Sequence, residues 1–288
     1  MDRILVIGGE GFLGLKLVRA LKQGYDVAAT YYKTKPEEAG CEWLQLDIVN
    51  PKATKDCISN LKPNVVVLLA AVSTTFGNME EIAKVNINGV RNVVNACQSV
   101  GSRLIFLSSD YVFNGEKGLY KPEDKPKPST PYGISKYEGE KLVASIPNSV
   151  ILRSSLMYGW HEPFQHKNFF TKVLTKLRGG EQVVTFNDCY RTPVYVGDVV
   201  RVLGAVISRD AKGLFHIGGP DYLSFTDFAH KIAKVFQLNE SLILSKPCNM
   251  SLPKLLGLDA KATEDFLGFR FVPLSQGLKL LATGGEAS

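Results

Sequence analysis

Long apolar segments and paired cysteines are both missing from this chain. The longest apolar run, Val65–Val72, is far shorter than the ~20 residues that a membrane-spanning helix needs. The five cysteines form an odd set without a C-x-x-C pair, a pattern that favours neither a disulfide framework nor a zinc site. No signal-peptide pattern precedes the first apolar residues, so we expect a cytoplasmic protein without membrane association.

A strong excess of charge of one sign is also missing. The chain has 34 basic and 28 acidic residues, for a net charge of +6, and the lysines are dispersed. This balance does not favour a nucleic-acid partner. The histidines lack metal-ligand spacing with carboxylates, so we expect no metal site. They are His161, His166, His216 and His230.

Short β-branched runs alternate with helical patterns through the first two-thirds of the 288 residues. This layout predicts an α/β fold with a doubly wound parallel sheet of the Rossmann type. Runs without polar alternation indicate strands that are covered on both faces. The expected strands are Ile4–Ile7, Val27–Thr30, Val65–Leu69, Leu104–Leu107, Val150–Arg153 and Leu214–Ile217.

Apolar stripes of helical period predict the helices between these strands. One stripe runs from Leu13 to Leu21, and another runs from Ile82 to Cys97 with Gly101 as the stop signal. The proline-rich segment 115–131 is expected to be a surface loop.

Beyond Tyr158 the strands become isolated, which predicts a smaller mixed α/β lobe for substrate binding. One of its helices covers Phe170–Leu177, and another begins at Ser224 with a capping box. Because Leu214–Ile217 still fits the sheet, we expect an interleaved boundary. The dinucleotide-binding domain should comprise residues 1–158 and a strand near 213–218, and the lobe should comprise residues 159–288.

A glycine-rich turn follows the first expected strand directly and leads into a helix. It reads Gly8-Gly9-Glu10-Gly11-Phe12-Leu13-Gly14. Glycine is required where such a turn is tight and where the backbone approaches a pyrophosphate, and the helix N-terminus supplies N–H donors. The turn therefore predicts a dinucleotide site.

The end of the second expected strand should contact the adenosine ribose of that dinucleotide. The segment Thr30–Lys35 contains no carboxylate that could accept a hydrogen bond from a 2′-hydroxyl. Lys33 or Lys35 could instead pair with a 2′-phosphate. The segment thus favours NADP(H), with NAD(H) as the alternative, and solvated loop lysines are the competing interpretation.

Tyr132 and Lys136 stand four residues apart, so they share one face of a predicted helix. A tyrosine with its ordinary pKa of about 10 is a poor acid at neutral pH. An ammonium ~4 Å from the phenolate, at an effective dielectric of ~20, attracts it by about 4 kcal/mol. This is about the free energy needed to lower the tyrosine pKa to 7. The pair therefore predicts a catalytic tyrosine whose pKa the lysine lowers.

The segment Ser108-Ser109-Asp110-Tyr111-Val112-Phe113 follows the fourth expected strand, at the edge where the sites of such sheets open. A serine hydroxyl there could hydrogen-bond a substrate carbonyl while the phenol delivers a proton. In isolation such serines are more often turn residues, but the glycine turn and the Tyr/Lys pair favour the catalytic interpretation.

With these motifs in this order, the chain resembles the extended short-chain dehydrogenases/reductases. Within them it most resembles the dTDP-4-dehydrorhamnose reductases and their relatives, which include the regulatory β subunit of methionine adenosyltransferase. The resemblance extends over residues 1 to about 280. It also uses Leu46-Asp47-Ile48, Ala70-Ala71-Val72, Asn86 with Gly89, Arg153, Tyr158-Gly159, Asn168-Phe169, Asp188–Pro193 and Leu267-Gly268-Phe269.

The resemblance implies roles for particular residues. Ser109, Tyr132 and Lys136 would be catalytic, and Lys136 would also bind the nicotinamide ribose. The expected cofactor residues are Gly8, Gly11, Phe12, Leu13, Gly14, Thr30, Lys33, Asp47, Ile48, Ala70, Ala71, Asn86 and Lys136. The expected substrate residues are Ser108, Asp110, Tyr111, Asn168 and Arg191.

The implied function is NADPH-dependent reduction of a nucleotide-linked 4-keto sugar. One departure concerns the sugar: where rhamnose-forming reductases have a tryptophan, this chain has Leu156. Two alternatives stay open, a nucleotide-sugar epimerase or dehydratase and a non-catalytic regulatory subunit that binds NADP. A homodimer is compatible with the resemblance.

Overall fold

The computed structural model describes residues 2–72 and 78–284 of the chain. It divides into two compact units. The first unit comprises Met1–Val112, Pro128–Arg153 and Val200–Phe215. The second comprises Phe113–Lys127, Ser154–Val199 and His216–Ser288.

The boundaries between the two units fall at other residues than the sequence predicts. Residues 113–127, expected in the first domain, belong to the second unit because backbone hydrogen bonds join Tyr120 to Gly257 and Asp259. Residues 200–212, expected in the lobe, belong to the first unit. There the Arg103 guanidinium donates to the carbonyl oxygens of Val206 and Ala211.

A seven-stranded sheet forms the centre of the first unit in the part of the chain that the structure describes, with strand order β11-β6-β5-β4-β1-β2-β3. The pairings of β1 with β2 and β4, of β2 with β3 and of β4 with β5 are parallel. Reversal of the order beside β1 is the doubly wound arrangement. The strands are β1 Arg3–Ile7, β2 Asp26–Tyr31, β3 Glu42–Gln45, β4 Val65–Leu68, β5 Arg103–Ser109, β6 Val150–Ser154 and β11 Gly213–Ile217.

Every expected strand is present, with ends that differ by one or two residues, so the predicted fold class is confirmed. The sequence analysis missed β3, in which Glu42 and Gln45 are exposed and Trp43 and Leu44 are half-buried. As the last strand of the sheet, β3 has a partner on one side only, and it lacks the apolar run of a buried strand.

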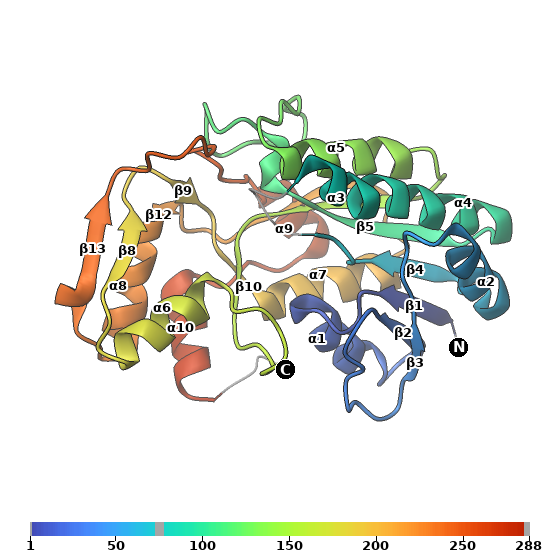
Figure 1. The fold of residues 1–288 in the computed structure, drawn as a ribbon, viewed down its shortest axis with the longest axis horizontal. Helices are drawn as coiled ribbons and strands as arrows, with labels where there is room; N and C mark the ends of the chain where they lie inside the picture. Colours follow the sequence, from blue (N-terminus) through green and yellow to red (C-terminus); the bar gives the residue numbers. More distant parts are fainter. Residues whose placement is uncertain (1, 73–77, 285–288) are drawn as a thin grey trace. The chain divides into compact units, whose positions relative to one another are not determined.

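Helices cover both faces of this sheet: Figure 1 shows α4 and α5 on one face and α1 on the other. The helices of this unit are α1 Phe12–Leu21, α2 Pro51–Leu61, α3 Met79–Ala83, α4 Val90–Val100, α5 Pro131–Val143 and most of α7 Val196–Ser208. Side chains from β1, β4, β5, α2 and α4 form one apolar core, which includes Leu5, Val66, Phe106, Ile58 and Val93.

The helix expected from Ile82 to Cys97 is interrupted. A π-helical segment, Lys84–Gly89, separates α3 from α4. Gly101 ends α4 in the left-handed conformation, with φ of 74°, as its sequence signal indicated. Such π-helical turns are often found at functional sites.

The second unit contains three two-stranded sheets among its described residues: β7 Met157–Tyr158 with β10 Val194–Tyr195, β9 Tyr190–Arg191 with β12 Leu223–Ser224, and β8 Val183–Phe186 with β13 Ile243–Lys246. Its helices include α6 Phe169–Arg178, α8 Phe225–Val235, α9 Lys261–Leu267 and α10 Leu274–Ala282. The capping box expected at Ser224 is present, because Ser224 and Asp227 bond each other's backbone N–H. No described helix is long and apolar enough to cross a membrane.

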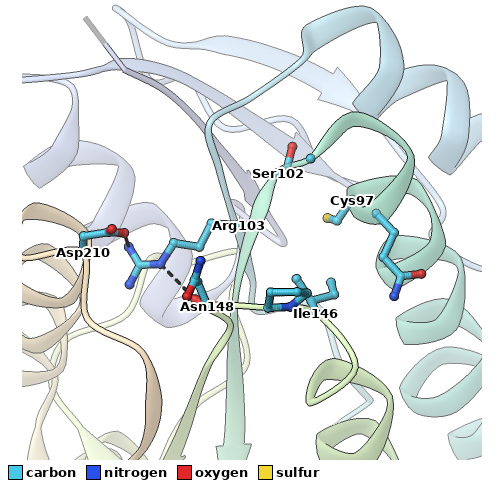
Figure 2. Close-up of a pocket in the computed structure, with 9 residues that line it drawn as sticks. Cys97, Ser102, Arg103, Ile146, Asn148 and Asp210 are labelled. Carbon is cyan, nitrogen blue, oxygen red and sulfur yellow. Dashed lines mark hydrogen bonds and ion pairs between the residues drawn. The ribbon is translucent and has the colours of Figure 1, made fainter.

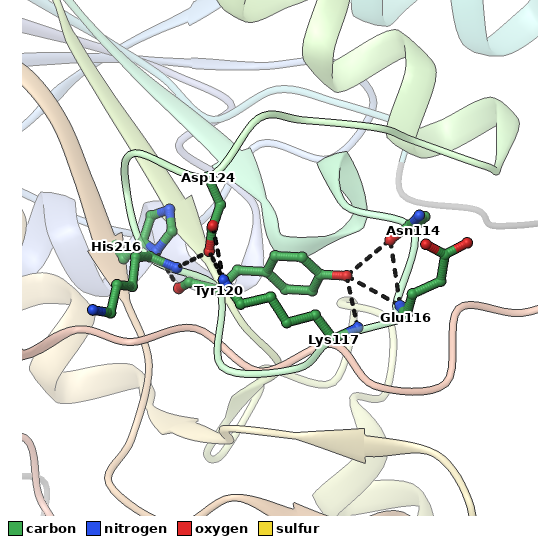
Figure 3. Close-up of polar contacts among 7 residues, drawn as sticks. Asn114, Glu116, Lys117, Tyr120, Asp124 and His216 are labelled. Carbon is green, nitrogen blue, oxygen red and sulfur yellow. Dashed lines mark hydrogen bonds and ion pairs between the residues drawn. The ribbon is translucent and has the colours of Figure 1, made fainter.

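The proline-rich segment of the second unit folds around Tyr120, which is buried (Figure 3). Its hydroxyl accepts hydrogen bonds from the backbone N–H groups of Glu116 and Lys117 and donates to Asn114 Oδ1 at 2.8 Å. The Tyr120 carbonyl bonds to Nδ1 of the buried His216 at 3.0 Å. The segment is therefore an ordered part of the second unit.

Removal of this hydroxyl should destabilise the protein. We expect Tyr120→Phe to lower the free energy of unfolding by about 1 kcal/mol, because the partly buried hydrogen bonds to the Glu116 and Lys117 N–H groups and to Asn114 are lost. Urea denaturation followed by circular dichroism measures the change. Tyr25→Phe, at a half-buried position of the first unit, is the control and should change stability by less than about 0.5 kcal/mol. Equal stability of the two variants would contradict a stabilising role of the Tyr120 hydroxyl.

Candidate active site

The glycine turn between β1 and α1 is held in a conformation that only glycine permits. Gly8 has φ of 86°, and a Cβ on it would lie 2.7 Å from the Ala70 nitrogen. A Cβ on Gly14 would lie 2.2 Å from the Gly8 carbonyl oxygen. Gly11 is the N-cap of α1, and because it has no side chain, none caps the first turn of the helix. The turn therefore presents backbone at the start of a helix, where an anionic group binds well.

The turn is anchored on the strands beside β1. Gly8 N–H donates to Thr30 Oγ1 at 3.1 Å, and Gly9 N–H donates to the Thr30 carbonyl at 2.9 Å. Ala70 N–H donates to the Ile7 carbonyl, which places Ala70 and Ala71 beside the turn. Thr30 is buried, so its role is to hold the turn. Phe12 and Leu13 begin α1, and Leu13 is buried.

The remaining expected cofactor residues of the sheet edge differ in exposure. Asp47 is exposed and accepts a hydrogen bond from the Val49 N–H at 2.9 Å. Ile48 is buried, and a Cβ on Gly89 of the π-helical segment would lie 2.7 Å from its side chain. Lys33 is exposed just after β2, with its Nζ 5.5 Å from the centre of the Tyr32 ring.

Asn86 of the π-helical segment joins three parts of the first unit. Its side-chain oxygen accepts from Val72 N–H at 2.8 Å, and its nitrogen donates to the Val72 carbonyl at 3.0 Å. The same nitrogen donates to Ser135 Oγ at 2.9 Å, and Ser135 donates to the Tyr132 carbonyl at 2.7 Å. Asn86 therefore positions α5, the helix that carries Tyr132.

Ser109 and Tyr132 lie close together at the carboxyl end of β5, and the Ser109 hydroxyl lowers the pKa of the Tyr132 phenol. Ser109 also donates to Asp110 Oδ1 at 3.1 Å and accepts from the Tyr111 N–H at 3.2 Å. The Tyr111 ring packs edge-on against the Tyr132 ring, with centroids 5.8 Å apart. The predicted catalytic serine and tyrosine thus belong to one cluster, in which Ser109 is buried and Tyr132 is half-buried.

The predicted effect of Lys136 on the tyrosine is wrong for this structure. Burial raises the pKa of the Tyr132 phenol, the Ser109 hydrogen bond lowers it, and Asp110 and Tyr111 raise it further. Lys136 instead places its Nζ 4.1 Å from the centre of the Phe106 ring. Burial lowers the pKa of Lys136 to about 7, opposed by the negative charge of Glu140. Burial strengthens the attraction between charged groups, but it also disfavours the charged form of Lys136 itself.

A buried ion pair under this cluster escaped the sequence analysis. Glu140 of α5 accepts from Arg153 of β6 through Nε at 2.9 Å and Nη2 at 2.8 Å. It also accepts from Ser108 Oγ at 2.6 Å. Ser108, which was expected to contact the substrate, therefore uses its hydroxyl in a hydrogen bond to the buried Glu140 carboxylate. The sequence signal that could have found the pair is a carboxylate four residues after Lys136 on an otherwise buried helix face.

The predicted substrate residues of the second unit have structural partners. Asn168 caps α6, accepting from the Thr171 N–H at 3.2 Å and donating to the Gly159 carbonyl at 2.8 Å. Arg191, expected to bind a diphosphate, is buried and donates to the carbonyl oxygens of Tyr190, Pro253 and Lys254. These bonds are typical of residues that hold the backbone of a domain in place. The N–H donors of the Arg191 guanidinium are used by backbone carbonyl oxygens.

A cavity of about 370 Å³ lies elsewhere in the first unit (Figure 2). It is lined by Cys97, Ser102, Arg103, Asn148 and Asp210, among others. Arg103 begins β5 and Ser109 ends it, so about 20 Å separates the cavity from the Ser109 cluster. The cavity therefore does not belong to the candidate active site.

Residues 1–256 match the family model described as RmlD substrate binding domain. The chain belongs to this family. Its glycine turn, its Ser109 and its Tyr132/Lys136 pair all lie within the matched region.

Relatives of this RmlD-family chain carry different names. It is 30% identical over 277 residues to the probable low-salt glycan biosynthesis reductase Agl14 of Haloferax volcanii, with 91% of each chain covered. It is 31% identical over 243 residues to a dTDP-4-dehydrorhamnose reductase of Aggregatibacter actinomycetemcomitans, covering 80% of this chain and 77% of that one. It is also 27% identical to the zebrafish methionine adenosyltransferase 2 subunit beta, covering 91% and 87%.

A solved structure supports the same relationship. The crystal structure of a hypothetical dTDP-4-dehydrorhamnose reductase from Sulfolobus tokodaii superimposes with a TM-score of 0.84 at 27% identity. The match covers 95% of this chain and 98% of that chain. The RmlD-family fold thus extends over both units.

The lowered pKa of Lys136 predicts a pH dependence of stability. Between about pH 7 and the ordinary lysine pKa of 10.5, the unfolded chain holds a proton that folded Lys136 releases, so its contribution to stability rises with pH. Below pH 7 both states are protonated and the contribution is constant. Lys136→Met should therefore reduce the slope of unfolding free energy against pH in this window, by up to about 1.4 kcal/mol per pH unit. Urea titrations from pH 6 to pH 10 measure both slopes, and parallel curves would show that Lys136 titrates normally.

Proposed function

We propose that this protein is a nicotinamide-dinucleotide-dependent reductase of a nucleotide-linked 4-keto sugar. The observation that carries the proposal is the cluster at the carboxyl end of β5, in which the Tyr111 N–H donates to Ser109 and the Tyr111 ring packs against Tyr132, with Lys136 one turn further along α5. The relatives named as reductases support the reaction class, and the dTDP-4-dehydrorhamnose reductase among them supports the nucleotide-sugar substrate.

The residues present fit a dinucleotide. A Cβ on Gly8 or Gly14 would meet backbone atoms, so only glycine allows the tight path of the turn into the start of α1, where a helix N-terminus favours an anionic group. Gly8, Gly11, Gly14, Phe12 and Leu13 would hold the phosphates. Ala70, Ala71 and Lys136 would line the path toward the nicotinamide, and Thr30 and Asn86 would act by positioning the turn and α5. When bound, the dinucleotide supplies the hydride.

Tyr132 would donate the proton to the carbonyl oxygen of the substrate. A proton donor must be protonated at the working pH, and the raised pKa of Tyr132 keeps the phenol in this form. Ser109 would donate a hydrogen bond to the same carbonyl oxygen. After the proton has been transferred, Ser109 would donate a hydrogen bond to the Tyr132 phenolate. Lys136, one turn further along α5, would bind the nicotinamide ribose and so hold the dinucleotide beside Tyr132.

Two alternatives share these motifs. A nucleotide-sugar epimerase or dehydratase would turn over without net consumption of added NADPH or NADH. A regulatory role is supported by one observation, the similarity to methionine adenosyltransferase 2 subunit beta. Oxidation of added reduced dinucleotide in the presence of a 4-keto sugar nucleotide distinguishes the reductase from both.

Loss of the phenol should abolish the reaction without abolishing cofactor binding. We expect Tyr132→Phe to lower kcat by at least about 100-fold, since general acid catalysis contributes this much, while NADPH binding stays within about threefold. Absorbance at the reduced nicotinamide band measures turnover, and fluorescence titration measures binding. Tyr137→Phe, one residue past Lys136 on the same helix, is the matched control and should retain activity. Turnover by the Tyr132 variant would refute the proposed mechanism.

A further inference from the structure

A carboxylate is buried beside the predicted catalytic lysine of the first unit. Glu140 is 4% exposed and lies one turn after Lys136 on α5, so the two side chains share one face of the helix. Lys136 is 3% exposed. A buried charge is costly without a partner, so two buried groups of opposite charge at this spacing favour each other's charged form.

Three hydrogen bonds fix the Glu140 carboxylate. Arg153 of β6 donates to it through Nε at 2.9 Å and through Nη2 at 2.8 Å. Ser108 of β5 donates at 2.6 Å to the same oxygen that accepts from Nε. Ser108 is the residue directly before Ser109, so these bonds hold α5 against the end of β5 that carries the predicted catalytic serine.

The Lys136 amine has an aromatic neighbour and a charged one. Its Nζ lies 4.1 Å from the centre of the Phe106 ring, whose face attracts a cation. Burial lowers the pKa of Lys136 to about 7, and the negative charge of Glu140 acts against this fall. Without the carboxylate, the amine would lose its proton at a lower pH.

The other charged groups on α5 and on the elements packed against it act elsewhere. Asp110, directly after β5, raises the pKa of Tyr132, and Glu138 of α5 accepts from Lys141 at 2.7 Å. Exposed charges are screened by water and salt. The charged side chains of α3, the π-helical segment and α4 are all exposed, and they are Glu80, Glu81, Lys84 and Arg91. Glu140 is therefore the carboxylate that governs the charge of Lys136.

We propose that Glu140 is a positioning residue of the reductase, which holds α5 against the end of β5 and keeps Lys136 in its ammonium form for the dinucleotide. The inference rests on the proposed function and refines it, because Glu140 acts through Lys136 and Ser108. An ammonium donates charge-assisted hydrogen bonds to ribose hydroxyls, and these are stronger than the bonds of a neutral amine.

The titration of Lys136 in the unliganded full chain tests the proposal. NMR of protein labelled with carbon-13 at the lysine ε carbons follows each amine, and the Lys136 signal is the one that Lys136→Met removes. The wild-type midpoint is expected at about pH 7. The double variant Glu140→Gln/Arg153→Met should lower this midpoint by at least about one pH unit, because the attraction of the carboxylate is lost.

The double variant separates the charge effect from unfolding. Glu140→Gln alone leaves the Arg153 charge buried without its partner, which favours unfolding, whereas removal of both charges together is often tolerated. Circular dichroism of the double variant checks the fold. Glu138→Gln is the matched control, because it removes one negative charge from a half-buried position of the same helix. It should leave the Lys136 midpoint unchanged.

Dinucleotide binding gives a second measurement. Fluorescence titrations with NADPH should give a wild-type Kd that rises by about fivefold as pH passes through the Lys136 midpoint, since a hydrogen bond from a charged group contributes more than one from a neutral group. Lys136→Met should lack this rise. In the double variant, the rise should move to the lower pH at which its Lys136 titrates.

Each outcome has a separate meaning. An unchanged Lys136 midpoint in the folded double variant, or an equal fall in Glu138→Gln, overturns the role of Glu140 while the proposed reductase stands. A lowered midpoint without a matching move of the binding curve overturns the link to the dinucleotide. Failure of the wild type to bind NADPH overturns the proposed function, and the NMR midpoints still test the effect of Glu140 on Lys136. A lowered midpoint and a moved binding curve together support the proposal.

Discussion

The close approach of α5 to β5 and the turn after it is the constraint on which the candidate active site depends. A Cβ on Gly133 would lie 2.0 Å from the Tyr111 carbonyl oxygen, and one on Gly139 would lie 2.8 Å from the Phe106 ring. Gly133 and Gly139 thus let the backbone of α5 approach the turn after β5 and the strand itself. This contact brings Tyr132 to Ser109 and Lys136 over Phe106. A larger residue at either glycine would push apart the groups that the proposed reaction needs together.

Buried polar groups then fix the helix in this position. Glu140 joins α5 to Arg153 of β6 and to Ser108 of β5, and Ser135 joins it to Asn86 of the π-helical segment. Removing one partner of such a buried pair is costly because the other charge stays buried, by about 3–5 kcal/mol in general. Burial that positions Lys136 also lowers its pKa. Rigidity and altered proton affinity therefore arise from the same burial.

Much of the architecture follows from local sequence signals. Apolar runs located the strands with two covered faces, glycines located the turn and the end of α4, and Ser224 with Asp227 marked the start of α8. The edge strand Glu42–Gln45 was missed because only two of its four residues, Trp43 and Leu44, are apolar. The π-helical segment was missed because its residues fit an ordinary helical stripe.

The sequence by itself determined the fold class, the glycine turn and the pairing of Tyr132 with Lys136 on one helix, because each depends on residues near one another in the chain. The tertiary structure alone decided which polar side chains meet. In the folded chain Ser108 bonds to Glu140, Arg191 donates to the carbonyl oxygens of Pro253 and Lys254, and Glu10 accepts from Tyr32. These contacts join residues far apart in sequence, and their energies depend on burial and on the charges around them. No local pattern encodes such surroundings, so they become readable only when the chain is folded.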